Sequence, residues 1–176
     1  MATVSLQERC AKIELLVLDV DGVLTDGRII HGGDGVEIKE FHVRDGSGIK
    51  LWQKAGKRVG ILSGRACKAV DIRAAELGID TVVQGAADKQ AALLAMTTSL
   101  GVQVEQTCFI GDDLPDVPAL RCCGLAVAVA DACREASEDA QYVTRLPGGR
   151  GAVREVIEVI LRCQGLWQKL VDAYRR

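Results

Sequence analysis

Residues 15–27 read LLVLDVDGVLTDG, an apolar run that leads directly into two aspartates separated by one valine. A short continuous apolar run is typical of a strand buried on both faces of a parallel sheet. In open α/β sheets, active sites lie beyond the carboxyl ends of such strands. Asp19 and Asp21 are therefore predicted to stand at the mouth of a site. Apolar strands often end in acidic loops that have no catalytic role. Further motifs elsewhere in the chain are therefore needed to show whether these aspartates take part in catalysis.

Short apolar runs alternate with amphipathic segments along the chain. The runs predict strands at 15–20, 58–62, 81–83, 107–110 and 126–129. The amphipathic segments predict helices at 47–55, 66–77, 88–100 and 115–123. Alternating strands and helices favour parallel pairing through right-handed crossovers. The expected fold is a doubly wound, Rossmann-like α/β sheet covered by helices on both faces.

Two segments depart from this alternation. Glycines at 32, 33 and 35 separate two partly alternating runs within 28–43, which predicts a projecting β-hairpin. An isolated hairpin is only marginally stable, so we expect it to pack, in particular against another subunit. The second segment, 147–176, begins with a glycine-rich stretch and continues into a helix with one apolar face, weakened at Gly165.

Composition limits the class of protein. With 176 residues and 48% hydrophobic content, the chain is predicted to form a single domain over 1–176. A net charge of −2 and only 3% aromatic residues argue against a nucleic-acid partner. No apolar run approaches the roughly 20 residues of a membrane span, and no signal segment is visible. We therefore expect a cytoplasmic protein whose seven cysteines are reduced.

Two further motifs follow predicted strands. Ser63, Gly64 and Arg65 come directly after the second strand, where a hydroxyl and backbone N–H groups can hold a phosphoryl oxygen. Taken alone, Ser63 is more simply the N-cap of a helix. Lys89 lies in the first turn of a predicted helix, where a cation opposes the helix dipole unless an anion faces it. Taken alone, it is more simply a solvated surface lysine.

A cluster of acids follows the strand at 107–110. The sequence there is GDDLPD, with carboxylates at Asp112, Asp113 and Asp116. Clustered acids repel one another unless a cation binds among them. Ligation by oxygen, without histidine or cysteine, indicates Mg²⁺. Asp116 by itself is better explained as a solvated cap of the turn. In a doubly wound sheet, all four motifs converge on one edge.

The order of these motifs resembles that of the haloacid dehalogenase superfamily of phosphotransferases. The resemblance implies that Asp19 attacks phosphorus while Asp21 protonates the leaving group and later activates water. It implies phosphate binding by Ser63, Gly64 and Lys89. Mg²⁺ would be held by Asp19, the backbone carbonyl of Asp21, and Asp112, with Asp113 and Asp116 behind these ligands.

Members of the superfamily usually carry a cap domain, but no cap fits here. The interval between Asp21 and Ser63 leaves room for the hairpin and one helix. The interval between Ser63 and Lys89 leaves room for little beyond one βα unit. A member without a cap must close its site with another subunit or leave it open, which again implicates the hairpin in an oligomer.

A narrower resemblance is to the 3-deoxy-D-manno-octulosonate 8-phosphate phosphatases. It is carried by DVDGVLTDG at 19–27, FHVRDG at 41–46, the glycine at 85 before Asp88 and Lys89, and GGRGAVRE at 148–155. This family implies a homotetramer, an eight-carbon phosphorylated sugar acid as substrate, and a role in lipopolysaccharide synthesis. It also implies that the glycine-rich C-terminal segment can reach a neighbour's active site. Residues after Gly165 have no match.

Three arginines, Arg44, Arg65 and Arg150, are candidates for binding the substrate's carboxylate or hydroxyls, because the arginine fork pairs with carboxylates. Ordinary surface ion pairing explains each of them equally well. The alternative activities are a nine-carbon sugar-acid 9-phosphate phosphatase, a receiver-like signalling domain and a silent regulatory homologue. The order of the motifs along the chain disfavours a receiver domain. The lysine of a receiver follows the last functional strand, whereas Lys89 precedes Asp112.

Overall fold

The chain folds around a six-stranded sheet in the computed structural model, which describes residues 4–175. Its strands are β1 (Leu15–Leu18), β4 (Arg58–Leu62), β5 (Thr81–Val83), β6 (Thr107–Gly111), β7 (Leu125–Ala128) and β8 (Tyr142–Val143). The order across the sheet is β5-β4-β1-β6-β7-β8, and all neighbours run parallel. The sheet reverses its direction of winding at β1, which pairs with β4 on one side and β6 on the other. The predicted doubly wound α/β fold is confirmed.

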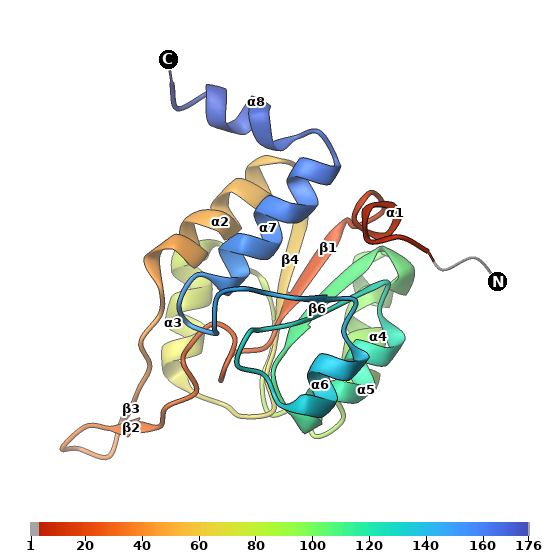
Figure 1. The fold of residues 1–176 in the computed structure, drawn as a ribbon. Helices are drawn as coiled ribbons and strands as arrows, with labels where there is room; N and C mark the ends of the chain where they lie inside the picture. The colour runs from red at the N-terminus through yellow and green to blue at the C-terminus, as the bar shows by residue number, and fades with distance from the viewer. Residues whose placement is uncertain (1–3, 176) are drawn as a thin grey trace.

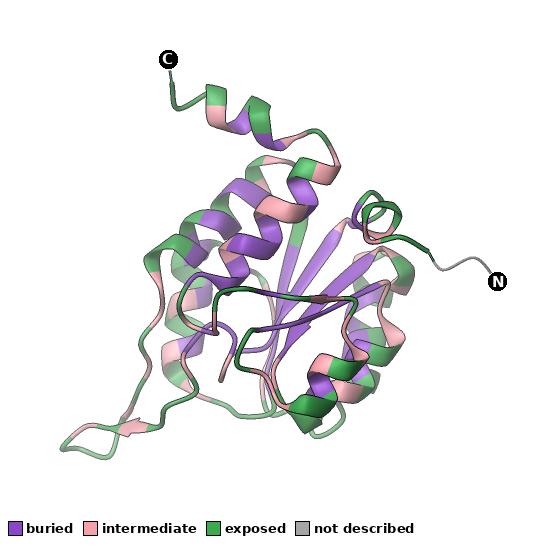
Figure 2. Cartoon of the chain, in the orientation of Figure 1, coloured by how far each residue is buried: buried purple, intermediate pink, exposed green. Residues whose placement is uncertain are grey.

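Helices cover both faces of the sheet (Figure 1). One face carries α1 (Leu6–Cys10), α2 (Val43–Lys54), α3 (Lys68–Leu77), α7 (Ala152–Cys163) and α8 (Trp167–Asp172). The other carries α4 (Lys89–Leu100), α5 (Val117–Cys122) and α6 (Arg134–Asp139), with 3₁₀ turns η1 (Val104–Gln106) and η2 (Leu114–Asp116) between strands and helices. Strand β1 is completely buried between the layers, as the purple strands of Figure 2 show. Successive side chains of β1 point to opposite faces of the sheet. Leu16 and Leu18 belong to the hydrophobic core under α2 and α7, and Leu15 and Val17 belong to the core under α4 and α5.

Helix α2 begins four residues earlier than the sequence pattern predicts, and two glycines lie inside it. Glycine in a helix interior costs about 1 kcal/mol relative to alanine, so Gly46 and Gly48 weaken the helical signal. A Cβ on Gly48 would lie 3.2 Å from the Cα of Arg154 in α7. The missing side chain therefore lets α2 and α7 pack closely, and this packing stabilises a helix that local propensity does not favour.

The predicted hairpin is present and projects from the sheet edge (Figure 1). Its strands, β2 (Ile30–His31) and β3 (Glu37–Ile38), are antiparallel and only two residues long. Three apolar side chains on it, Ile29, Val36 and Ile38, are about half exposed. Among the described residues, only α2 besides this hairpin separates β1 from β4, and only α3 and β5 separate β4 from α4. This part of the chain therefore has no cap domain between its motifs.

The remaining differences from the prediction are at the ends of elements. Strand β1 stops at Leu18 instead of Val20, so Asp19 is the first residue after it. The predicted helix at 115–123 is divided into η2 and α5. Helices α1 and α6 and strand β8 were not predicted. Within residues 4–175, no helix combines the length and apolar character required to cross a membrane.

Candidate active site

The loops after β1, β4 and β6 meet at the carboxyl edge of the sheet around a cavity of about 190 Å³. The residues that line it are either charged or small. They are Asp19, Asp21, Ser63, Gly64, Arg65, Lys89, Asp112, Asp113, Pro115 and Asp116. The structure thus brings together the side chains that four separate sequence motifs supply. Two of the predicted residues, Arg44 and Arg150, do not line this cavity.

Lys89 lies at the centre of the site, between two aspartates. Its Nζ is 2.7 Å from Asp19 Oδ1 and also binds Asp116 Oδ1, and the three residues are almost fully buried. Burial lowers the pKa of Lys89, but the two carboxylates outweigh it and raise that pKa above its usual value. Lys89 is the first residue of α4, so these aspartates are the anions that its unfavourable place in the helix dipole requires. It is not a solvated surface lysine.

Asp116 is buried, so the expectation that it is solvated is wrong, whereas its capping role is confirmed, because its side chain accepts from the backbone N–H of Asp113 in a capping box of η2. Only 1% of it is exposed, and both of its carboxylate oxygens are engaged. Oδ1 binds Lys89, and Oδ2 accepts hydrogen bonds from the backbone N–H groups of Asp112 and Asp113. Asp116 therefore fixes the acidic turn and Lys89 at the same time. This arrangement supports its predicted place behind the metal ligands.

The acids of the site fit a divalent cation. Carboxylate oxygens of Asp19, Asp112 and Asp116 lie within 4.8 Å of one another. Burial and the charge of Asp116 raise the pKa of Asp19 to about 6, against the opposing effect of Lys89. Burial and the charges of Asp19 and Asp116 raise the pKa of Asp112 to about 8. One ammonium group does not neutralise this cluster, and oxygen ligands of this kind are suited to Mg²⁺.

These pKa values predict how pH affects the stability of the metal-free chain. The pKa of Asp112 is 3.8 in the unfolded chain, the usual value for aspartate, so between 3.8 and about 8 the folded state binds more protons than the unfolded state. Stability therefore falls as pH rises through this range. We expect thermal melts in EDTA to give a lower Tm at pH 8 than at pH 6, and added Mg²⁺ to reduce the difference. Asp112→Asn should also reduce the difference in Tm between pH 6 and pH 8. A higher Tm at pH 8 than at pH 6 in EDTA would contradict this account.

Ser63 is not the cap of a helix. Helix α3 begins only at Lys68, after Cys67 as its N-cap, so both the helix-capping and the helix-N-terminus interpretations of Ser63 are wrong. Ser63 is buried, its N–H donates to Val83 O, and its Oγ accepts from the N–H of Arg65 at 3.2 Å. The hydroxyl is thus held at the cavity by a turn between β4 and α3. It remains positioned to donate to an anion in the cavity.

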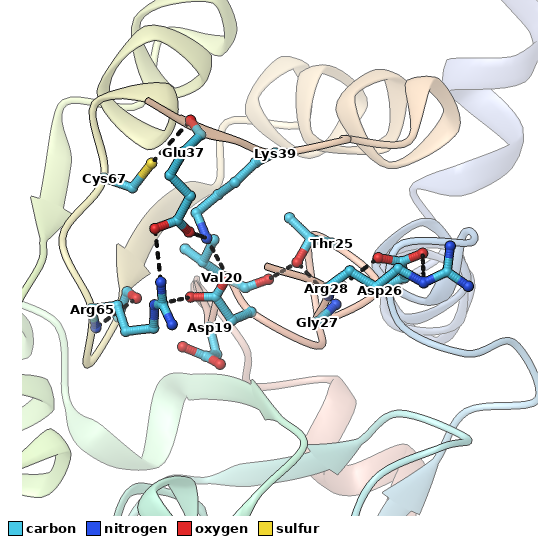
Figure 3. A network of polar contacts seen from close by, with 12 residues as sticks. Asp19, Val20, Thr25, Asp26, Gly27, Arg28, Glu37, Lys39, Arg65 and Cys67 are labelled. Carbon is cyan, nitrogen blue, oxygen red and sulfur yellow. Dashed lines mark hydrogen bonds and ion pairs between the residues drawn. The ribbon is translucent and has the colours of Figure 1, made fainter. Parts of the chain in front are cut away.

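Asp21 is held by a side chain that the sequence did not single out, Lys39, which points toward Glu37 in Figure 3. Lys39, from the segment after β3, binds Asp21 Oδ1 and lies 2.8 Å from Glu37 Oε1. Glu37 Oε2 is also 2.7 Å from Arg65 Nη2, and Arg65 Nε is 3.6 Å from Asp21 Oδ2. Burial lowers the pKa of Lys39, but bonds to Asp21 and Glu37 raise it overall. The hairpin therefore orients the second aspartate of the DVD motif.

The loop after β1 is also fixed from the C-terminal side. The glycine-rich stretch 147–151 packs against this loop of its own chain, and Gly149 N–H donates to Val23 O at 2.9 Å. A Cβ on Gly148 would lie 1.6 Å from the carbonyl oxygen of Gly22. A Cβ on Gly22, whose φ is +95°, would meet the Asp112 carboxylate at 2.0 Å. Three parts of the chain thus approach at distances that only glycine permits.

Gly148→Ala should therefore impair the site. The added methyl group must displace the Gly22 carbonyl, which follows Asp21 directly, and misplacement of a catalytic group by 1 Å can cost about 100-fold in rate. We expect kcat to fall at least about tenfold, measured on a variant whose fold is verified by circular dichroism. Gly33→Ala is the matched control, because no atom lies within 4 Å of its Cβ position. Equal kcat for both variants would contradict this role.

Comparison with known proteins agrees with this geometry. A family model described as haloacid dehalogenase-like hydrolase matches residues 81–157. The 3-deoxy-D-manno-octulosonate 8-phosphate phosphatase of Yersinia pestis is 48% identical over 157 residues, which are 89% of this chain and 84% of the relative. The same enzyme of Escherichia coli K12 is 46% identical with the same coverage.

A solved structure of the same enzyme also resembles this chain. The 3-deoxy-D-manno-octulosonate 8-phosphate phosphatase of Moraxella catarrhalis, in complex with magnesium ion, phosphate ion and a KDO molecule, superposes with a TM-score of 0.93 at 39% identity. The match covers 96% of this chain and 97% of the other. The fold and the carboxylate site define a hydrolase of the haloacid dehalogenase class. Within that class, the chain belongs to the family of 3-deoxy-D-manno-octulosonate 8-phosphate phosphatases.

Proposed function

We propose that this chain is a Mg²⁺-dependent phosphatase that hydrolyses 3-deoxy-D-manno-octulosonate 8-phosphate, the eight-carbon sugar-acid ester, to the free sugar acid and phosphate. The observation that carries the proposal is the placement of Asp19, Asp21, Ser63 and Lys89 around one cavity, in a chain 48% identical to an enzyme with this name. The product sugar acid places the reaction in the synthesis of lipopolysaccharide precursors.

In the first step, a carboxylate oxygen of Asp19 attacks phosphorus. The bond between phosphorus and the sugar oxygen breaks, and Asp21 gives its proton to the leaving oxygen. Lys89, which is 2.7 Å from Asp19, keeps the carboxylate oriented and offsets the repulsion between two anions. Ser63 Oγ and the backbone of Gly64 hold the phosphoryl oxygens. The products of this step are the free sugar acid and an aspartyl phosphate on Asp19.

In the second step, Asp21 takes a proton from water, whose oxygen attacks the aspartyl phosphate. Phosphate leaves, and both aspartates return to their initial states. Lys39 and Glu37 keep Asp21 in place through both proton transfers. We propose Asp19, the backbone carbonyl of Asp21, and Asp112 as ligands of Mg²⁺, with Asp113 and Asp116 behind them. The cation supplies charge neutralisation of the phosphoryl oxygens when it is bound.

Arg65 is the arginine that we propose for substrate binding. It lines the cavity with 45% of its side chain exposed, so its guanidinium can reach a bound sugar acid. A charged hydrogen bond is worth about 1.5–3 kcal/mol. We expect Arg65→Gln to raise KM about 10- to 100-fold with a smaller change in kcat, in steady-state phosphate release. Arg121→Gln, an exposed arginine outside this cavity, is the control, and an unchanged KM in Arg65→Gln would contradict the role.

Arg44 and Arg150 line a different cavity, so within one chain they do not meet the reacting groups. They remain candidates only for a substrate bound in a neighbouring subunit. We propose that such neighbours exist, in a cytoplasmic homotetramer assembled through the hairpin. Its half-exposed Ile29, Val36 and Ile38 support an interface there. Light scattering of the purified chain tests this assembly independently of activity.

A substrate panel tests the proposed activity. Phosphate release is measured for the eight-carbon 8-phosphate and the nine-carbon 9-phosphate sugar acids at matched concentrations. We expect the higher kcat/KM for the eight-carbon ester. A higher kcat/KM for the nine-carbon ester would assign the chain to the alternative phosphatase activity. Absence of repeated turnover with either ester would instead favour a receiver-like or silent regulatory domain.

A further inference from the structure

A second cavity, of about 560 Å³, lies along α7 and shares no lining residue with the active site. It is formed by α7, the start of α2 and the segment between β8 and α7. Five arginines line it: Arg44, Arg145, Arg150, Arg154 and Arg162. The lining includes only two carboxylates, so three positive charges are in excess in a chain whose net charge is −2.

The two glutamates of this cavity are already occupied. Glu155 accepts hydrogen bonds from Tyr142 Oη at 2.6 Å and from the backbone N–H groups of Arg145 and Leu146. Glu158 is shared between Arg154 at 2.8 Å and Arg162 at 3.4 Å. These carboxylates fix the walls of the cavity and leave little capacity to neutralise further arginines.

The arginines at the open side of the cavity retain free donors. The side chain of Arg145 is 88% exposed, and its ion pair with Glu155 is a long one at 3.4 Å. Arg150 is 58% exposed and contacts Asp26 at 3.3 Å through one nitrogen. A guanidinium carries five N–H donors and stays charged at all physiological pH values. An anion in the cavity can accept hydrogen bonds from these unused donors and offset the excess of arginine charge.

We propose that this cavity, which we call the arginine cavity, binds a small multivalent oxyanion. Arginine forks pair bidentately with phosphate and carboxylate groups, and several of them together favour a ligand that carries more than one. The volume is within the usual range for small-molecule sites, about 300–1,000 Å³. Polyphosphates and polycarboxylates both carry several oxyanion groups of this kind. Diphosphate and citrate are the two probes that separate these sources.

Calorimetric titration of the full-length chain, stripped of metal with EDTA and then dialysed free of EDTA, tests the proposal at low salt. Removal of the metal weakens anion binding in the active site, because five aspartates line that cavity against two cationic side chains, Lys89 and Arg65. We expect diphosphate or citrate to bind with one site per chain. The probe that binds more tightly shows whether the cavity favours polyphosphates or polycarboxylates. Arg145→Gln should weaken that binding at least fivefold. Arg134→Gln, whose side chain is 84% exposed and lies outside the arginine cavity, should change it less than twofold.

Arg44→Gln provides a second variant on another wall of the cavity, and it should weaken binding as Arg145→Gln does. Arg65→Gln, in the active site, should leave this binding within twofold of the original chain. Absence of binding by both probes would overturn the proposal. Equal affinity in Arg145→Gln and Arg134→Gln would overturn it too, because binding would then reflect general surface charge. Loss of binding in Arg65→Gln alone would assign the anion to the active site and also overturn it.

Discussion

Asp19→Asn abolishes turnover if Asp19 is the nucleophile. An amide cannot form the aspartyl phosphate, so we expect kcat to fall at least about 10³-fold in steady-state phosphate release. The fold should persist because asparagine has nearly the same shape and Lys89 keeps Asp116 as its partner. Removing a buried acid whose pKa is raised also removes an unfavourable charge. Thermal melting and light scattering should therefore give results close to those of the original chain.

Asp80→Asn is the matched control for this substitution. Asp80 is exposed and lies just before β5, at the opposite edge of the sheet from the cavity. The same change of carboxylate to amide should leave kcat within twofold there. Substantial activity in Asp19→Asn, with its fold intact, would exclude Asp19 as the nucleophile.

Removal of the metal should have an effect of similar size. Asp19 and Asp112 are carboxylates with raised pKa values in a buried cluster, so without a cation the cluster repels an anionic phosphate ester. We expect EDTA to lower phosphate release at least about 10³-fold and excess Mg²⁺ to restore it.

Calcium is the informative control for the metal. Ca²⁺ prefers six to eight ligands at longer distances than Mg²⁺, so it should occupy the acids without orienting Asp19 for attack. Activity should stay low in Ca²⁺, and Ca²⁺ should inhibit the Mg²⁺-loaded chain. Undiminished rates in EDTA would show that the chemistry does not require these acids to hold a cation.

The sheet and the convergence of the motifs could be predicted because each rests on a local pattern with a geometric consequence. An apolar run such as 15–18 predicts a buried strand, and parallel strands bring their carboxyl ends to one edge. Lys89 was recognisable because its place in the first turn of a helix conflicts with the dipole. The structure resolves that conflict by placing Asp19 and Asp116 against its ammonium group.

Other features could not be predicted because they depend on contacts between distant parts of the chain. Nothing around Lys39 marks it as functional, and its role appears only when the hairpin folds over Asp21. Asp116 seemed solvated because burial of a carboxylate depends on the partner, Lys89, that lies 27 residues earlier. Ser63 resembled a cap because the length of the turn before α3 is not encoded in a simple pattern.

The missed elements have equally specific reasons. Helix α6, with the sequence REASED, buries only Ala136 and therefore has no apolar face to recognise. Strand β8 has two residues, which is too short for an alternating pattern. Helix α1 carries a signal that could have been used, because Ser5 and Glu8 form a capping box.

The division of roles between Asp19 and Asp21 is tested most directly by trapping the phosphoryl group. The chain is mixed with the eight-carbon ester and Mg²⁺, quenched in acid within one turnover, digested, and its peptides are weighed by mass spectrometry. Our account predicts a phosphoryl group on the peptide that contains Asp19 and localises it to that residue. A phosphoryl group on Asp21 or Asp112, or on no residue while phosphate is being released, would contradict it.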